Sequence, residues 1–254
     1  MADGLSLVEL SIVLVILGLL VGGVLTGQSL IRAAELRSIT TEFEKYQAAV
    51  HTFRDQYFAL PGDMTNATAF WGTMSSGTCP GATGGAGTET CNGNGNAILD
   101  QAPANGQASE EFMAWQHLAN AGLIEGSYTG VSGSGSTAHS IIGTNVPRGK
   151  ISSTGWSFIY TGTVANPADP AWFVGDYGQL LQIGAQSGVN RTGEVAFKPE
   201  EVWNIDTKMD DGRPGYGSVK TTKFSHLPCP TTDDPATAEY NLANSDIVCN
   251  VKIT

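Results

Sequence analysis

The stretch "GLSLVELSIVLVILGLLVGG" (residues 4–23) begins a long apolar run near the N-terminus of the chain. From Leu10 to Ile31 no residue carries a formal charge, and most residues are Leu, Val, Ile or Gly. As an α-helix this run is roughly 33 Å long, enough to cross the hydrocarbon core of a bilayer. A cleaved signal peptide is the alternative, but no basic residue precedes the run, and the run is longer than a signal peptide needs. The sequence therefore predicts a transmembrane segment.

Two pairs of glycines in the run share a spacing of four residues, Gly18 with Gly22 and Gly23 with Gly27. Small residues at this spacing allow helix backbones to approach each other closely in apolar surroundings. The alternative is that glycine is simply tolerated in membrane helices. Two adjacent pairs favour a helix that packs against other helices.

The helical pattern continues beyond the apolar run, because no proline or glycine interrupts residues 28–60. Apolar residues at spacings of three and four predict an amphipathic helix with one face to bury, at Leu36, Ile39, Phe43, Tyr46, Val50, Phe53 and Tyr57. Pro61 and Gly62 are the expected stop signal. One helix of about 55 residues, roughly 80 Å long, is therefore expected from Leu5 to Ala59.

The chain changes character after residue 60, where all 11 prolines, all four cysteines and most of the 32 glycines lie. Residues 156–162 and 171–184 are rich in aromatic and β-branched residues and predict strands. Capping and stop signals predict short helices within residues 109–122 and 198–212. The expected fold class is α+β, with a long helix, half transmembrane and half amphipathic, packed on a β-rich globular head. Long glycine-rich loops are expected at 73–107 and 127–140.

Four cysteines allow three disulfide pairings. The two local pairs, Cys79 with Cys91 and Cys229 with Cys249, are expected because each would close a loop that has little apolar content. Closing a loop near 15 residues contributes about 3 kcal/mol of stability. Disulfides persist in oxidising compartments, so the head is expected in the periplasm or outside the cell.

The motif G-L-S-L-V-E-L before the apolar stretch resembles the N-terminus of type IV pilins and of type II secretion pseudopilins. In that family a prepilin peptidase cuts after the glycine and methylates the new N-terminus. The resemblance implies cleavage between Gly4 and Leu5. The C-terminal cysteine pair is similar to the disulfide-bounded region of many pilins. The implied organisation is a leader (1–4), an N-terminal helix (5–60, with the transmembrane and filament-core part at about 10–31) and a globular head (61–254).

The same resemblance implies a role for Glu9, the one carboxylate at the mouth of the apolar run. A lone charge in the membrane interior costs on the order of 3 kcal/mol or more, so it needs a partner. In pilin filaments that partner is the N-terminal amine of a neighbouring subunit, here the amine of Leu5 after cleavage. The alternative is an interfacial glutamate that reaches water, which would suffice for a lone membrane anchor. The implied assembly residues are Glu9, Gly18, Gly22, Gly23 and Gly27.

Two classes of function follow from the resemblance. The first is a structural subunit of a pilus-like helical filament, or of a type II secretion pseudopilus. The second is a membrane-anchored binding module such as a minor pilin or tip adhesin. The implied partners are further copies of the chain, the prepilin peptidase and an inner-membrane assembly platform. The implied location is the inner membrane before assembly, then an extracellular pilus or a periplasmic pseudopilus.

Enzyme signatures such as G-x-S-x-G, H-E-x-x-H and the phosphate-binding loop do not occur in the chain, so no enzymatic activity is expected. The net charge of −11 disfavours a nucleic-acid platform, because phosphate binding needs clustered Lys and Arg. Nucleic acid is therefore not an expected partner.

Two segments are candidates for structural calcium. In the first, side chains alternate as in a calcium loop, but Ala97 stands at the glycine position and Pro103 where the bidentate glutamate belongs, so an Asn/Gly turn cluster is the favoured interpretation of Asn92, Asn94, Asn96 and Asp100. The second segment carries Asp206, Asp210 and Asp211 and is either a calcium site or an acidic helix end. No other metal or cofactor is expected.

Overall fold

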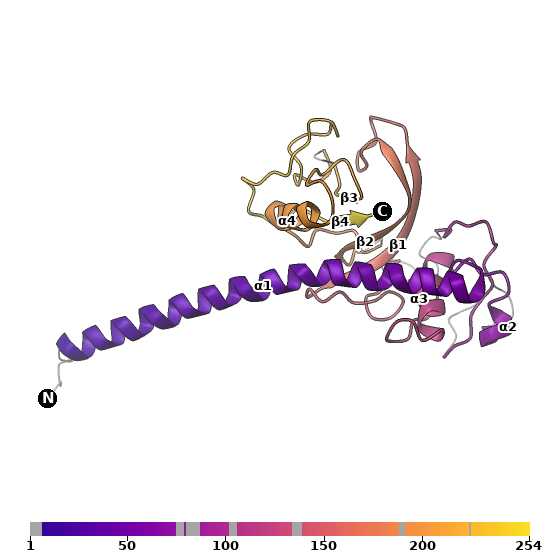
Figure 1. Cartoon of the computed structure of the whole chain (residues 1–254), viewed down its shortest axis with the longest axis horizontal. Helices are drawn as coiled ribbons and strands as arrows, with labels where there is room; N and C mark the ends of the chain where they lie inside the picture. Colours follow the sequence, from indigo (N-terminus) through magenta and orange to yellow (C-terminus); the bar gives the residue numbers. More distant parts are fainter. Residues whose placement is uncertain are drawn as a thin grey trace.

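The structure, a computed structural model, describes residues 7–74, 79, 87–101, 106–133, 139–187, 191–223 and 225–254. Figure 1 shows one long helix, α1, lying along a head formed by the rest of the described chain, with the N-terminal end of α1 far from the head. The elements are α1 (Leu7–Tyr57), α2 (Thr68–Trp71), α3 (Glu110–Asn120), β1 (Thr154–Val164), β2 (Gly175–Ala185), α4 (Pro199–Met209), β3 (Val219–Lys220) and β4 (Val251–Ile253).

Helix α1 runs without a break for 51 residues, which confirms the predicted continuous helix over the described part of its range. It ends at Tyr57, because Phe58 adopts a left-handed backbone conformation (φ 55°) before the chain reaches Pro61. Gly62 then allows a close approach that no other residue permits: a Cβ at this position would lie 2.2 Å from the Glu110 carbonyl oxygen. The proline and glycine therefore shape the turn after the helix rather than its last residue.

The second half of α1 packs on the head through the predicted apolar stripe. Its fully buried positions are spaced by three and four residues, namely Ile39, Glu42, Tyr46, Ala49 and Phe53. Leu36, Phe43, Val50 and Tyr57 pack against the same core at partial burial. Neither Glu42 nor Ala49 is among the predicted stripe positions, and Glu42 is the less expected of the two, since a carboxylate is rarely buried without partners.

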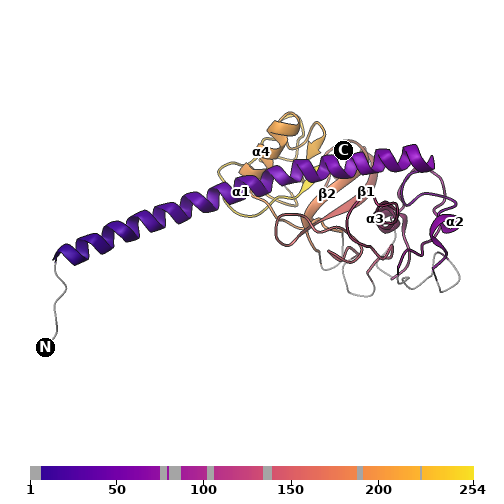
Figure 2. The ribbon, with the colours of Figure 1, turned by 60° about the horizontal axis from the view of Figure 1, so that its bottom comes forward.

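The described residues form a four-stranded antiparallel sheet with the strand order β1-β2-β4-β3. The long pair β1 and β2 confirms the two strands expected at 156–162 and 171–184. Helix α3 packs against both α1 and β1, and the Tyr46 ring of α1 contacts the rings of Trp115 and Trp156 at centroid distances of 5.0 and 5.6 Å. Helix α4 covers α1 further along, towards its free half (Figure 2).

Helices α3 and α4 confirm the two expected short helices. Strands β3 and β4, with two and three residues, were not expected, because such short segments carry no recognisable periodicity. The fold is thus α+β, with an apolar N-terminal helix packed on a small antiparallel sheet and its helices.

Both expected disulfides are formed, Cys79 with Cys91 and Cys229 with Cys249. The second holds the C-terminal segment against α4 and the sheet, because the Cys249 backbone also pairs with Phe197 just before α4. The Cys229–Cys249 disulfide therefore links the segment around Cys229 to the C-terminal segment, which in turn pairs with the chain just before α4.

Candidate functional site

The free half of α1, residues 7–31, is exposed along its whole length. It is the one helix among the described residues that is long and apolar enough to cross a membrane. An 18-residue window in it has a mean hydropathy of 2.6, and none of that window is buried against the head. A surface of this kind is stable only against lipid or other apolar helices. Figure 1 shows the free half extending beyond the head.

The three hydroxyl side chains in the free half are hydrogen-bonded within the helix. The hydroxyls of Ser11, Thr26 and Ser29 donate to backbone carbonyls three or four residues earlier, at 2.8, 2.9 and 2.8 Å. An apolar environment penalises every unsatisfied donor, so these internal bonds suit a helix that leaves water.

The four predicted assembly glycines lie on this free half. A Cβ at Gly18, Gly22, Gly23 or Gly27 would meet nothing within 4 Å, so the head gives no reason for glycine at these positions. Close approach by a helix outside the chain is the remaining packing explanation for them.

Glu9 lies in the first turn of α1 as the structure describes it, at the outer end of the free half. The predicted cleavage residues Gly4 and Leu5 lie outside the described residues. Cleavage, methylation and the pairing of Glu9 with a neighbouring amine therefore remain predictions.

An ion pair marks the point where α1 meets the head. The Arg32 guanidinium donates to both carboxylate oxygens of Glu201 on α4, at 2.5 and 2.9 Å, and to Glu35 at 3.1 Å. Glu201 also accepts a hydrogen bond from the Lys198 backbone N–H at 2.9 Å. Bidentate geometry fixes the orientation as well as the distance of the two groups, so the pair sets the angle between α4 and α1.

Glu42 is the polar contact in the middle of the interface between α1 and the head. Its carboxylate accepts hydrogen bonds from the Trp156 indole N–H at 3.2 Å and from the Lys150 backbone N–H at 3.3 Å. Burial raises the pKa of Glu42, although these two hydrogen bonds oppose the rise. The ionised Glu42 carboxylate therefore lowers the free energy of unfolding relative to a neutral hydrogen-bond acceptor in the same place.

Replacing Glu42 tests this contact. Glu42→Ala leaves the buried indole N–H of Trp156 and the partly buried backbone N–H of Lys150 without their acceptor, and we expect it to lower the free energy of unfolding by about 1–3 kcal/mol. Glu42→Gln retains an acceptor without the charge. Because the raised pKa makes the wild type lose stability as the pH rises above about 4.5, the glutamine variant should be flatter with pH. Urea unfolding of the full chain in detergent at pH 5 and 7.5 measures both effects.

Glu44 is an exposed neighbour on α1, and Glu44→Gln is the matched control. Its free energy of unfolding and its pH dependence should equal those of the wild type. A wild-type urea midpoint for Glu42→Ala would show that the buried carboxylate does not hold the helix to the head.

His117 of α3 holds the turn that follows α1. Its Nδ1 accepts a hydrogen bond from the Gly62 backbone N–H at 2.9 Å, and its Nε2 lies 2.8 Å from the Thr90 hydroxyl. Nδ1 is therefore unprotonated and the ring neutral. Burial lowers the pKa of His117 to about 3. The sequence showed His117 only as one of four scattered histidines, because its partners are distant in the chain.

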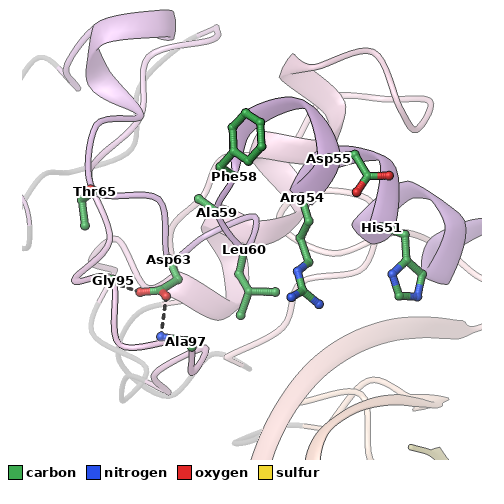
Figure 3. A pocket seen from close by; sticks show the side chains of 10 residues that line it. All are labelled: His51, Arg54, Asp55, Phe58, Ala59, Leu60, Asp63, Thr65, Gly95 and Ala97. Atoms are coloured by element: carbon green, nitrogen blue, oxygen red, sulfur yellow. Dashed lines mark hydrogen bonds between the residues drawn. The ribbon is translucent and has the colours of Figure 1, made fainter.

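A groove of about 590 Å³ lies between the last turns of α1 and the loop around Gly95. Figure 3 shows Arg54 and His51 extending from α1 along the groove, and the Phe58 ring directed away from Asp63. The remaining lining residues are Asp55, Ala59, Leu60, Thr65 and Ala97.

Two carboxylates hold the loop that forms one wall of this groove. Asp63 accepts hydrogen bonds from the backbone N–H groups of residues 95, 96 and 97, at 2.5, 3.2 and 2.7 Å. Glu110 accepts two more, from residues 94 and 100, at 2.8 and 2.9 Å. The chain segment "ALPGD" thus supplies, through Asp63, the anchor of a loop that follows some thirty residues later.

The Asn-rich segment within this loop forms turns. Asn94 and Asn96 each accept a hydrogen bond from the backbone N–H two residues further along, at 2.9 and 2.8 Å. Asn92 accepts one from the Thr68 N–H at 2.9 Å. The side-chain amides of Asn94 and Asn96 donate to Asp100. Because the oxygens expected to bind calcium are used inside the loop, this geometry favours the turn interpretation.

Asp206, Asp210 and Asp211 do come together, with one carboxylate oxygen of each within 4.8 Å of the others. The buried Asp206 accepts hydrogen bonds from the Tyr240 hydroxyl at 2.8 Å and the Gly212 N–H at 3.1 Å. Burial raises the pKa of Asp206 to about 7, and the two neighbouring carboxylates add to the rise. Such oxygens suit calcium, and they also form a hydrogen-bonded helix end, so both interpretations of this segment remain.

Comparison with known proteins found no matching family model, no similar curated protein and no similar solved structure.

Proposed function

We propose that this chain is a structural subunit of a type IV pilus-like helical filament. The observation that carries the proposal is the division of α1 into two halves. The second half is covered by the head, whereas residues 7–31 form an apolar rod that no described part of the chain covers. Lipid covers such a rod in a membrane-anchored precursor, and the rods of other copies cover it in a filament core.

The remaining features of the free half support the same proposal. Its hydroxyls are satisfied internally, its glycines present open backbone to a neighbouring helix, and its one carboxylate lies near the N-terminal end. A simple membrane anchor requires only the apolar length. The glycine pairs and Glu9 are better explained by contacts between helices, in the inner membrane first and in an extracellular pilus or periplasmic pseudopilus afterwards.

Processing gives the first test of this proposal. The intact mass of the subunit in sheared filaments should lack Met1 to Gly4 and carry one methyl group on Leu5. Mass spectrometry of filaments from the source cell measures both changes at once. Retention of Met1 in assembled fibres would contradict the proposed maturation.

The abundance of the chain in the same filaments separates the two classes of function. A structural subunit should be the main protein of the fibre. A trace amount in fibres built from another protein would indicate a minor pilin or tip adhesin instead.

A further inference from the structure

An exposed aromatic patch lies at the end of the head most distant from the N-terminus. We call it the distal patch and define it as the exposed Phe58 and Phe70 together with the half-buried Tyr57 and Trp71. The side chain of Phe58 is 94% exposed, and that of Phe70 is 56% exposed. Ring contacts join three of its members, with the Tyr57 ring centroid 5.3 Å from that of Phe70 and 5.5 Å from that of Trp71.

Both the side chain and the backbone of Phe58 are in energetically unfavourable states. Its ring is almost fully in water, and its backbone adopts φ 55°, a left-handed conformation that is rare for a bulky side chain. Glycine would adopt this conformation without strain. Ala97 and Ser153 are the other non-glycine residues in the described ranges with positive φ, and neither exposes a large apolar side chain. A left-handed residue commonly follows the last turn of a helix, usually as glycine, so the unusual feature at position 58 is the bulky, exposed ring.

The surroundings of the distal patch resemble an interface. Polar side chains of the neighbouring groove, among them Arg54, His51 and Asp55, lie beside the aromatic residues. An apolar centre with a polar rim is the usual anatomy of a protein–protein contact surface.

We propose that the distal patch binds the free half of α1 of a second copy of this chain. The inference rests on the proposed filament function and names one of its contacts. The free half is the large apolar surface that the described head leaves uncovered, and Figure 1 shows it at the opposite end of the molecule from α2, which carries Phe70 and Trp71. A contact between two different surfaces gives an open helical filament when the rotation between copies does not close into a ring.

The length of α1 sets the stagger of this contact. The middle of the free half, near Leu20, lies about 57 Å along the helix from Phe58, at 1.5 Å per residue. Copies with parallel helices, displaced axially by about that distance, bring the distal patch of one copy beside the free half of another.

Phe58→Gly tests the proposal, because it removes the ring and relieves the strain together. Ser153→Gly is the matched control, since it relieves the same kind of strain at φ 66° on an exposed residue outside the distal patch. Both variants should keep the melting temperature of the head in detergent equal to that of the wild type or raise it by a few degrees. Phe58→Gly alone should reduce the fraction of subunit in filaments by roughly tenfold or more. This is the loss expected when the burial of one phenylalanine side chain at the contact is removed. Phe58→Leu should restore most of it.

Cross-linking identifies the partner segment directly and decides the matter where Phe58→Gly is misfolded. Copies carrying Phe58→Cys are mixed with copies carrying a single cysteine at Val13, Leu17, Leu20 or Val24, or at Leu242 on the head as control. Disulfide-linked dimers with a free-half position are expected.

Wild-type assembly of Phe58→Gly would overturn the inference, as would cross-links formed with Leu242 but not with the free half. Failure of the wild type itself to form filaments would instead contradict the proposed function.

Discussion

Replacement of Glu9 by leucine is expected to abolish filament formation while the head remains folded. Glu9 lies in the first described turn of α1, far from every residue of the head core, so its removal should leave head stability unchanged. Insertion into the membrane should become easier, because a charge is removed from an apolar segment. In the proposed filament the same change leaves the Leu5 amine of a neighbouring copy buried without its ionic partner. Breaking a buried pair in this way costs about 3–5 kcal/mol at each contact.

Sheared filaments and membrane-bound subunit, quantified side by side for wild type and Glu9→Leu, measure the effect. The variant should accumulate in the membrane fraction and enter mixed fibres poorly when expressed with the wild type. Glu9→Gln keeps the side-chain length and shows whether the charge or the shape is required. Normal fibres at normal abundance from both variants would show that Glu9 has no part in assembly.

Acidification is expected to destabilise the head through His117. Burial lowers the pKa of this imidazole to about 3, whereas it titrates near 6.5 in the unfolded chain. Below pH 6.5 the imidazole is protonated in the unfolded state but stays neutral in the folded state. The free energy of unfolding therefore falls as the pH drops from 6.5 towards 3. At pH 4 the loss from this one group is about 3 kcal/mol relative to neutral pH. Protonation of Nδ1 would also remove the hydrogen bond from the Gly62 backbone.

His117→Asn is the variant that isolates this effect. An asparagine oxygen can accept the Gly62 hydrogen bond without titrating, although ring contacts with Phe53 and Trp71 are lost. Buried carboxylates such as Glu42 shift stability in the opposite direction on acidification, so the informative quantity is the difference between wild type and variant. Urea unfolding should give the wild type a higher free energy of unfolding than His117→Asn at pH 7. The difference between the two proteins should be smaller at pH 4. Parallel pH profiles for the two proteins would rule out His117 as the acid-sensitive group.

Sequence reasoning succeeded where the pattern is long and local. The continuous helix α1, its buried stripe, the helices α3 and α4 and the strand pair β1–β2 all follow from periodicity and capping signals. The two local disulfides followed from spacing and from the poor apolar content of the loops that they close.

The polar contacts that fix the head were beyond the reach of the sequence. Glu42 and Trp156 are 114 residues apart, and Arg32 and Glu201 are 169 apart, so no local pattern links them. Burial of Glu42 also breaks the rule that apolar residues make the buried face of a helix. The distal patch was hidden for another reason: Phe58 directly follows the stripe, and the sequence shows neither its left-handed backbone nor the exposure of its ring.

The bidentate contact between Arg32 and Glu201 also determines how load passes through the molecule. Traction on the free half of α1 reaches the head first at this pair, before the packed stripe that begins at Leu36. The pair and the short helix behind it resist shear along the helix axis, and the aromatic core further along resists peeling. A fibre built from such subunits would therefore withstand pulling through many contacts engaged one after another, and tension that separates Arg32 from Glu201 would leave the rest of the head attached.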